Sequence, residues 1–247
     1  QVRTKGTSTR EKDTPGTRED MAEFQRCLRR WDHGLGTVLD ALDARSLTDD
    51  TLLIVTTDHG LAMPRAKMSL YDPGIEVLLM MRWPGLIAAG YRTDALVSNV
   101  DLTPTVLEAV GGQPTDAMQG KSFWPVLRDE RPDHREMIFA EKTYHENYDP
   151  MRCVRTERYK FIRNFDVNDG TDLPATNMRR ATYRENLDHC LEPNLRHPYV
   201  ELYDLEADPL ERNNVADDPA CAEVRAKLDQ ALSDWMHRTG DPLLEGP

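Results

Sequence analysis

The 247-residue sequence has few cysteines, few aromatic residues and no long apolar run. Its longest apolar stretch is the size of a strand, far short of the roughly 20 residues that a membrane span requires. We therefore expect no membrane partner. The cysteines are Cys27, Cys153, Cys190 and Cys221. They form neither a CxxC pair nor the spacing of a zinc site, and both free thiols and a disulfide remain open.

An excess of basic residues is also missing. The chain carries 31 Lys and Arg against 43 Asp and Glu, a formal net charge of −12. Nucleic-acid binders need a basic face, so we expect no nucleic-acid partner. The hydrophobic share of 39% is typical of a globular protein. Residues 1–16 lack any apolar period, and we interpret them as a linker or a cut edge.

Hydrophobic spacing predicts an α/β arrangement in the first half of the chain. Apolar residues recur at helical intervals up to about Arg45, with Thr17 as the expected N-cap. The apolar run 51–57 predicts a strand that is buried on both faces. A helix followed by such a strand is typical of a parallel α/β sheet. A second buried strand at 75–83 and a short helix capped by Thr103 are expected next.

The second half predicts a small antiparallel α+β subdomain. Strands are expected at 137–141, 151–156, 159–165 and 201–205. A tight hairpin is expected at Arg158, and the polar residues 164–198 are expected to form a long loop. Asp218-Pro219 should open the last helix, and Gly240 should end it.

One tripeptide is a candidate for chemistry. Asp58-His59-Gly60 follows the first buried strand, at the edge where open α/β sheets bind ligands. A carboxylate and a neutral imidazole together suit a divalent cation, although Asp-His-Gly is often only a turn. Lys67 lies in the same loop and could neutralise charge that develops on an oxyanion. Considered alone, it is better explained as a solvated surface lysine.

Several ordered motifs resemble the sulfatases of the alkaline phosphatase superfamily. They are TLLIVTTDHG, then Lys67 with Tyr71 and Gly74, WPG, VSNVDLTPTVLEAVGG, QGKSFWPVL and ELYDLEADPLERNNVADDP. The segments YHENYDPMRCV and WMHRTGDP are most similar to heparan N-sulfatases, the N-sulfoglucosamine sulfohydrolases. The resemblance covers nearly everything from Thr17 to Pro242.

The resemblance implies both a fold and a division of the chain. Residues 17–125 should form the C-terminal part of an alkaline-phosphatase-like α/β/α sheet domain. Residues 126–247 should form the antiparallel α+β subdomain. The chain would then correspond to the C-terminal half of a family member.

The same resemblance implies roles for four residues. Asp58 and His59 match metal ligands of the family, with calcium as the expected cation and manganese or zinc as alternatives. Lys67 matches a catalytic basic residue that also contacts the sulfate. His145 in YHEN matches a histidine near the substrate pocket, and its other interpretation is an ordinary loop histidine. The implied substrate is a sulfated sugar or another small sulfated molecule.

The chain departs from the family pattern at the nucleophile. Sulfatases use a Cys or Ser in a C/S-x-P-x-R motif, converted to formylglycine, and this sequence has no such motif. Cys27 lies in the predicted helix and is expected to be core-facing or flanking. We expect the formylglycine and further metal ligands upstream of Gln1, and an isolated chain without activity. The expected partner is the missing N-terminal half or a second copy in a self-associated dimer, because the strands would otherwise expose apolar faces.

Two alternatives stay open. A phosphodiesterase or phosphonate monoester hydrolase of the same superfamily would share the Asp-His site. A non-catalytic fragment or interaction domain would need no complete site. The sequence favours the hydrolysis of sulfate esters or N-sulfates because of its C-terminal signature.

Overall fold

The computed structural model describes residues 13–63, 65–166, 179–185 and 198–246. The chain divides into two compact units. The first comprises the described residues of Gln1–Asp32, Thr57–Val77 and Phe139–Pro247, and the second comprises His33–Thr56 and Leu78–Ile138. The predicted domain boundary between residues 125 and 126 stays a prediction.

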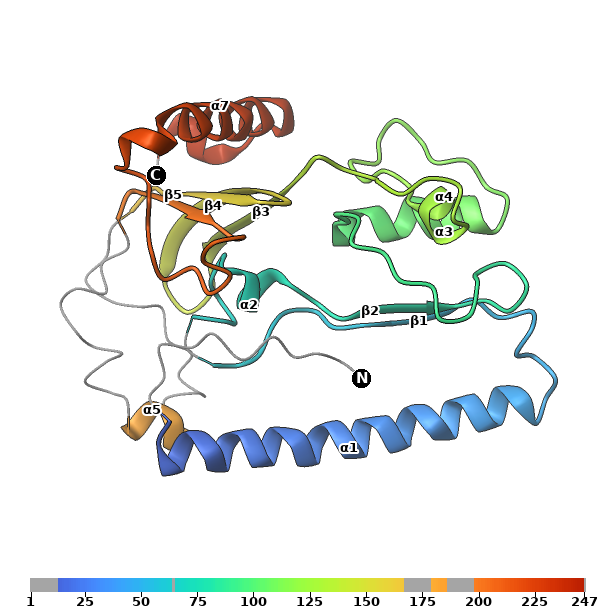
Figure 1. Cartoon of the computed structure of the whole chain (residues 1–247). Helices are drawn as coiled ribbons and strands as arrows, with labels where there is room; N and C mark the ends of the chain where they lie inside the picture. Colours follow the sequence, from blue (N-terminus) through green and yellow to red (C-terminus); the bar gives the residue numbers. More distant parts are fainter. Residues whose placement is uncertain (1–12, 64, 167–178, 186–197, 247) are drawn as a thin grey trace. The chain divides into compact units, whose positions relative to one another are not determined.

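Figure 1 shows the helices and strands in their order along the chain. The α-helices are α1 (Pro15–Asp43), α2 (Asp72–Ile75), α3 (Leu102–Ala109), α4 (Trp124–Leu127), α5 (Ala181–Glu185) and α7 (Ala222–Thr239). The strands are β1 (Leu53–Thr56), β2 (Leu79–Arg82), β3 (Met137–Tyr144), β4 (Tyr148–Thr156), β5 (Tyr159–Asn164) and β6 (Val200–Asp204). Short 3-10 turns are η1 (Asn99–Asp101), η4 (Pro219–Cys221) and η5 (Pro242–Glu245). None of the described helices is long and apolar enough to cross a bilayer.

Helix α1 begins three residues earlier than the predicted N-cap implies. Pro15 is its first residue, a position that proline favours because its missing N–H is not needed there. The hydroxyl of Thr14, not that of Thr17, accepts a hydrogen bond from the first turn, at 3.2 Å from the Thr17 amide. Cys27 is exposed on this helix, so the expectation of a core-facing or flanking thiol was wrong.

The first sheet differs from the predicted parallel one. Strand β1 pairs with β2 in antiparallel register, from Leu53 opposite Arg82 to Thr56 opposite Leu79. Only Val55 of β1 is buried, so the described chain does not cover the strand on both faces as expected. The predicted strand 75–83 is shorter than expected, because Ile75 closes α2 and β2 begins at Leu79.

The second sheet confirms the antiparallel prediction. Its strand order is β3-β4-β5-β6, and both the β4–β5 and the β5–β6 pairs are antiparallel. The predicted hairpin at Arg158 joins β4 to β5, where the Thr156 hydroxyl accepts a hydrogen bond from the Tyr159 amide at 2.9 Å. Paired residues share one face of a sheet, so the register separates two sets of side chains.

Different parts of the first unit pack against the two faces of this sheet. One face carries Val154, Phe161 and Leu202, all with 0% exposure, and α7 packs against β4 and β5. Figure 1 shows α7 on one side of the sheet and α2 on the other. On the α2 side, Cys153 and Ile162 belong to a core that includes these residues of the preceding segment and the sheet: Leu70, Tyr71, Met151, Tyr203 and Leu205.

The C-terminal elements follow the prediction with one correction. Gly240 ends α7 in the left-handed conformation at φ 64°, which glycine adopts without steric cost. The expected loop 164–198 contains the short helix α5. The Thr182 amide of α5 donates a hydrogen bond to the Asp20 carboxylate at 2.9 Å. Most of the rest of that loop, with Cys190, lies outside the described residues.

Candidate functional site

The candidate site lies on a tightly folded loop, which we call the site loop (residues 58–63 and 65–74). The Gly60 amide donates to the Gly74 carbonyl at 3.0 Å. A Cβ atom at Gly60 would lie 1.7 Å from the Pro73 carbonyl oxygen, and one at Gly74 would lie 2.3 Å from that of Ala66. Both positions therefore require glycine, because the backbone approaches too closely for any side chain.

Asp58 and His59 point their ligand atoms at each other. The His59 Nδ1 atom lies 2.7 Å from the Gly60 carbonyl oxygen. Since a carbonyl only accepts, Nδ1 carries a proton, and a neutral ring in this tautomer has its lone pair on Nε2. That Nε2 atom lies 3.3 Å from Oδ2 of Asp58, whose side chain is 86% exposed. Two acceptors that converge in this way fit a shared divalent cation.

Lys67 returns to the same end of the loop. Its amide donates to the Leu61 carbonyl at 2.8 Å, which also accepts from the Met63 amide. Arg65 and Met68 adopt positive φ angles of 57° and 73° to make this fold-back. Non-glycine residues rarely adopt such angles, and they do so chiefly where surrounding contacts enforce them. The loop thus brings the Lys67 backbone beside Leu61, three residues after Asp58.

His145 lies on the turn between β3 and β4. Its amide donates to the Asn147 carbonyl at 3.2 Å, and its side chain is 41% exposed. Lys142 of β3 connects this hairpin to the site loop, because its Nζ atom donates to the Met68 carbonyl at 3.1 Å. Among the described residues, His145 forms no hydrogen bond or ion pair with Asp58, His59 or Lys67. The hairpin is therefore a neighbour of the site loop rather than part of the Asp-His pair.

A buried carboxylate holds the site loop on the sheet. Glu201 of β6 is 2% exposed and accepts from the Tyr71 hydroxyl at 2.8 Å and from the Tyr203 hydroxyl at 2.5 Å. Asn164 donates to its other oxygen at 2.8 Å. Burial, and then the charge of Glu201, raise the pKa of Tyr71, so the phenol stays protonated and donates. The guanidinium of Arg65 stacks on the Tyr71 ring at 3.8 Å.

A second group of buried charges surrounds Asp72. Lys160 of β5 has 0% side-chain exposure, and its Nζ atom lies 2.6 Å from Asp72 and 2.7 Å from Glu211. Arg155 binds both Asp72 carboxylate oxygens at 3.1 Å. Burial alone would raise the pKa of Asp72, but the charge of Lys160 and the hydrogen bond from Arg155 outweigh it and hold the pKa at about 2. Burial raises the pKa of Glu211, against the opposing charge of Lys160.

Sequence reasoning missed these anchoring residues. Lys160, Glu201 and Glu211 are charged, so the hydrophobic pattern marks them as surface residues, yet each is at most 2% exposed. One signal was available: Glu201, Tyr203 and Glu211 all lie in the ELYDLEADPLERNN motif. The structure gives this motif a physical role, since it ties the site loop to the sheet.

The described residues do not by themselves complete a metal site. They contain no group of three or more His, Cys, Asp or Glu side chains that could hold an ion. Calcium takes about six to eight ligands, and catalytic zinc sites have about three protein ligands. Asp58 and His59 fit a cation by their chemistry and convergence, but two side chains are too few for either kind of site.

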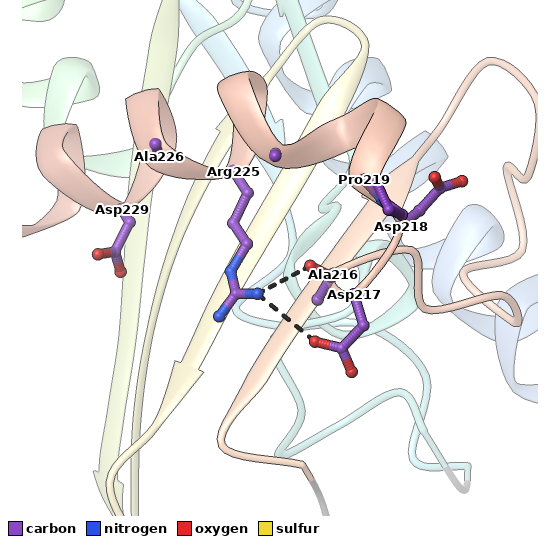
Figure 2. A pocket seen from close by; sticks show the side chains of 8 residues that line it. Ala216, Asp217, Asp218, Pro219, Arg225, Ala226 and Asp229 are labelled. Carbon is purple, nitrogen blue, oxygen red and sulfur yellow. Dashed lines mark hydrogen bonds and ion pairs between the residues drawn. The ribbon is translucent and has the colours of Figure 1, made fainter.

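The first turn of α7 lines a separate concavity, which does not suit a sulfate (Figure 2). Asp217, Asp218 and Asp229 contribute three carboxylates to its lining. The one lining arginine, Arg225, is already occupied by the Ala216 carbonyl at 2.9 Å and by Asp217 at 3.5 Å. An anionic ligand would meet net negative charge there.

Two family models match the chain. Residues 59–178 match the model described as N-sulphoglucosamine sulphohydrolase, C-terminal, and residues 2–112 match the model described as Sulfatase. The first match begins at His59 and includes Lys67 and His145. The second includes the whole site loop.

Curated relatives agree with these matches. The chain is 31% identical over 228 residues to an ulvan-active sulfatase of Formosa agariphila, covering 91% of this chain and 45% of the relative. It is 30% identical over 265 residues to human N-sulphoglucosamine sulphohydrolase, covering 95% of this chain and 51% of the relative. The chain thus spans about half the length of the curated relatives it matches.

Solved structures agree as well. A structure described as a 2-O GAG sulfatase matches with a TM-score of 0.73 and 25% identity, covering 93% of this chain and 45% of the other. A phosphonate monoester hydrolase from Silicibacter pomeroyi matches with a TM-score of 0.62 and 27% identity, covering 84% and 38%. The fold is that of the alkaline-phosphatase-like enzymes, and the chain belongs to the sulfatase family, matching the C-terminal part of its members.

Proposed function

We propose that this chain belongs to a metal-assisted hydrolase that releases sulfate from sulfate esters or N-sulfates of sugars. Family membership supports the reaction class. The human relative, which is named N-sulphoglucosamine sulphohydrolase, supports an N-sulfated glucosamine as the substrate. The other relatives include ulvan-active sulfatases, so the identity of the sugar is a separate and more specific proposal than the reaction class.

The observation that carries the proposal is the convergence of Asp58 and His59. The proton on Nδ1 and the 3.3 Å separation of Nε2 from the Asp58 carboxylate prepare both groups to hold one cation. We propose calcium, because oxygen-rich family sites favour it, with manganese or zinc as alternatives that an imidazole ligand also suits. When bound, the cation would supply positive charge next to the sulfate oxygens.

Lys67 and His145 would act on the substrate. The Lys67 ammonium would stabilise negative charge on the sulfate oxygens as the bond to sulfur breaks. His145, on the hairpin beside the site loop, would bind the sugar. The buried contacts of Tyr71 and Asp72 fix the loop backbone, so the groups on it need little reorganisation during the reaction.

The nucleophile is expected outside this chain. We propose a formylglycine, together with the remaining metal ligands, on residues that are not part of this sequence. The isolated chain should therefore be inactive. Sulfate release by the purified 247-residue chain alone, at enzyme-like rates, would contradict this proposal.

The test is a substitution series in a protein that includes the missing residues. Lys67→Met should lower kcat/KM for N-sulfoglucosamine by about 100-fold or more, because one preformed charge-stabilising group is lost. Lys227→Met removes an exposed lysine from α7 and is the matched control, with unchanged activity expected. Equal activity of the two variants would refute a catalytic role for Lys67.

The metal role has a separate readout. Calorimetric titration of the 247-residue chain with calcium should show weak binding, since two protein ligands remain, and Asp58→Asn should abolish it. Tight binding that Asp58→Asn leaves unchanged would place the cation elsewhere.

A phosphonate monoester hydrolase is the second candidate. The Silicibacter pomeroyi structure supports it, because its identity to this chain is slightly higher than that of the 2-O GAG sulfatase. Turnover of an aryl sulfate, N-sulfoglucosamine, a phosphodiester and a phosphonate monoester by the same preparation would separate the two. Preference for either phosphorus compound would overturn the sulfatase proposal.

We further propose that additional polypeptide covers the apolar side of α1. Leu28 and Trp31 on this helix are 45% and 46% exposed. Large apolar side chains grouped on one helix face typically mark an interface. The partner would be the N-terminal half of the protein or a second copy of the chain. A monodisperse monomer of the 247-residue chain in light scattering would argue against it.

A further inference from the structure

Tyr144 is an exposed aromatic residue at the end of β3, next to the candidate site. Its exposed fraction is 68%, the highest among the large hydrophobic residues that the structure describes as exposed. β3 ends at Tyr144, and residues 145–147 make the turn to β4. The exposed ring directly precedes His145, the residue that we propose to bind the sugar.

The side of the sheet on which Tyr144 lies follows from strand geometry. Side chains two residues apart in a strand point to the same face. Lys142 points to the site loop, because its Nζ atom donates to the Met68 carbonyl at 3.1 Å. Thr143 points to the other face, where its hydroxyl accepts from Arg152 at 3.0 Å. Tyr144 therefore projects on the same face as the site loop.

The base of the hairpin is firmly fixed. Lys142 pairs with Asp149 at 2.6 Å, and the two side chains are only 9% and 12% exposed. Arg152, which is 1% exposed, donates to the Lys142 carbonyl at 2.9 Å and pairs with Asp241. An exposed ring on a rigid base loses little conformational entropy on binding, as a preorganised recognition residue should.

We propose that Tyr144 stacks on the pyranose ring of the sugar whose sulfate group is held at the site loop. The electron-rich face of an aromatic ring attracts the C–H groups of a sugar, and the phenol hydroxyl can hydrogen-bond to its edge. The Met68 carbonyl, which Lys142 holds, directly follows Lys67, so the ring and the proposed sulfate-binding lysine lie on adjoining segments. This inference rests on the proposed function and adds a sugar contact to it.

Two other tyrosines provide matched controls. Tyr148 opens β4 and has an exposed fraction of 40%. By strand alternation it points away from the face of Asp149. Tyr199 is 65% exposed but precedes β6, at the opposite edge of the sheet from β3. Neither should contact a sugar bound beside the site loop.

The direct test is fluorine NMR of the 247-residue chain labelled with 3-fluorotyrosine. Tyr→Phe substitutions assign the resonances. N-sulfoglucosamine and unsulfated glucosamine should both shift the Tyr144 resonance, and inorganic sulfate should not. Resonances of Tyr148 and Tyr199 should stay in place. The proposal fails if Tyr144 does not respond to either sugar, or if all three tyrosines respond alike.

Affinity measurements separate stacking from a structural role. Tyr144→Ala should weaken N-sulfoglucosamine binding by about fivefold, within the range measured for aromatic contacts. Tyr144→Phe keeps the ring and should bind within about twofold of the parent. Tyr148→Ala and Tyr199→Ala should bind like the parent. Equal weakening in all three alanine variants would overturn the proposal.

The outcomes also separate this inference from the proposed function. Glucosamine binding that depends on Tyr144, in a protein whose complete form releases no sulfate, would refute the proposed function alone. Sulfate release that is unaffected by Tyr144→Ala in both kcat and KM would refute the stacking role alone. A Tyr144 ring that instead binds an aromatic peptide in preference to either sugar would indicate a protein partner and overturn the inference.

Discussion

The two faces of the four-stranded sheet bury charge to different extents. The face under α7 is covered mainly by apolar packing, with Leu228, Leu232 and Met236 at no more than 1% exposure, and the buried charge that the structure describes there is the single pair of Arg152 and Asp241. The face under the site loop buries charges, above all Lys160 between Asp72 and Glu211. Apolar packing tolerates adjustment, whereas a charge network requires every partner to be in place. The charge network therefore fixes the site loop in one position. The loss of any one charged partner should destabilise the fold more than the loss of one apolar contact.

The largest expected effect comes from removing the central charge. Lys160→Met leaves Asp72 and Glu211 buried without their shared partner and should lower the free energy of unfolding by about 3–5 kcal/mol. Urea unfolding of the 247-residue chain measures it. Arg158→Ala removes an exposed ion pair with Asp204 and should leave the midpoint unchanged.

A double variant sharpens this result. Asp72 keeps its Arg155 partner, so adding Glu211→Gln to Lys160→Met removes the carboxylate that has lost its cation, and it should restore part of the lost stability. If the double variant is less stable than the single one, the network does not act as a charge cluster, and the contrast between the faces fails.

A cavity on the apolar face should cost slightly less. Leu232 is fully buried, and Leu232→Ala should lower the free energy of unfolding by about 2–4 kcal/mol through lost burial and the cavity left behind. Leu86→Ala, at a leucine with 43% exposure, is the control and should change it by less than about 0.5 kcal/mol. Similar losses in both variants would mean that α7 does not seal this face.

Acid should weaken the charged face first. The folded pKa of Asp72 is about 2, below its ordinary value of 3.8, so its stabilisation is complete above pH 4 and is lost as the pH falls toward 2. The expected loss is about 2 kcal/mol. Glu211 acts in the opposite sense at higher pH, because its raised pKa lets the folded state take up a proton first. Hydrogen exchange at pH 3 and pH 6 compares the protection of site-loop peptides with that of α7 peptides. The site-loop peptides should lose more protection at pH 3, and an equal loss in both would contradict the prediction.

The smallest effect is expected from the ion pair on the α7 face. Arg163 and Asp229 lie 2.5 Å apart, but their side chains are 24% and 48% exposed. Water screens such a pair, so Asp229→Asn should lower the free energy of unfolding by less than about 1 kcal/mol. A loss as large as that of Lys160→Met would show that charge matters equally on both faces.

Local patterns predicted the elements, but not always their partners. The helical spacing before Arg45, the hairpin at Arg158 and the glycine end of α7 were predicted, because each depends on neighbouring residues. The antiparallel pairing of β1 with β2 was not, since an apolar run indicates burial and not the direction of the neighbouring strand. The start of α1 was missed because Thr17 resembles a cap as well as Thr14 does.

The candidate site was likewise predicted only in part. Asp58, His59 and Lys67 were chosen from a motif. The structure places the first two with converging ligand atoms and brings the backbone of the third beside Leu61. Their metal, catalytic and substrate roles, with that of His145, remain proposals. The anchoring residues were not predicted, because a buried Lys160 or Glu201 looks like any surface charge until its partners are known.

The sequence by itself determined the family, the strand-loop order around Asp58 and the need for glycine at turns. These depend on residue type and short-range spacing, which a linear pattern contains. Only the tertiary structure decided which charges are buried, which face Tyr144 shares with the site loop, and how residues 200–214 hold a loop about 130 positions earlier. Such choices depend on contacts between distant segments, and desolvation makes a buried charge stable only where a specific partner meets it.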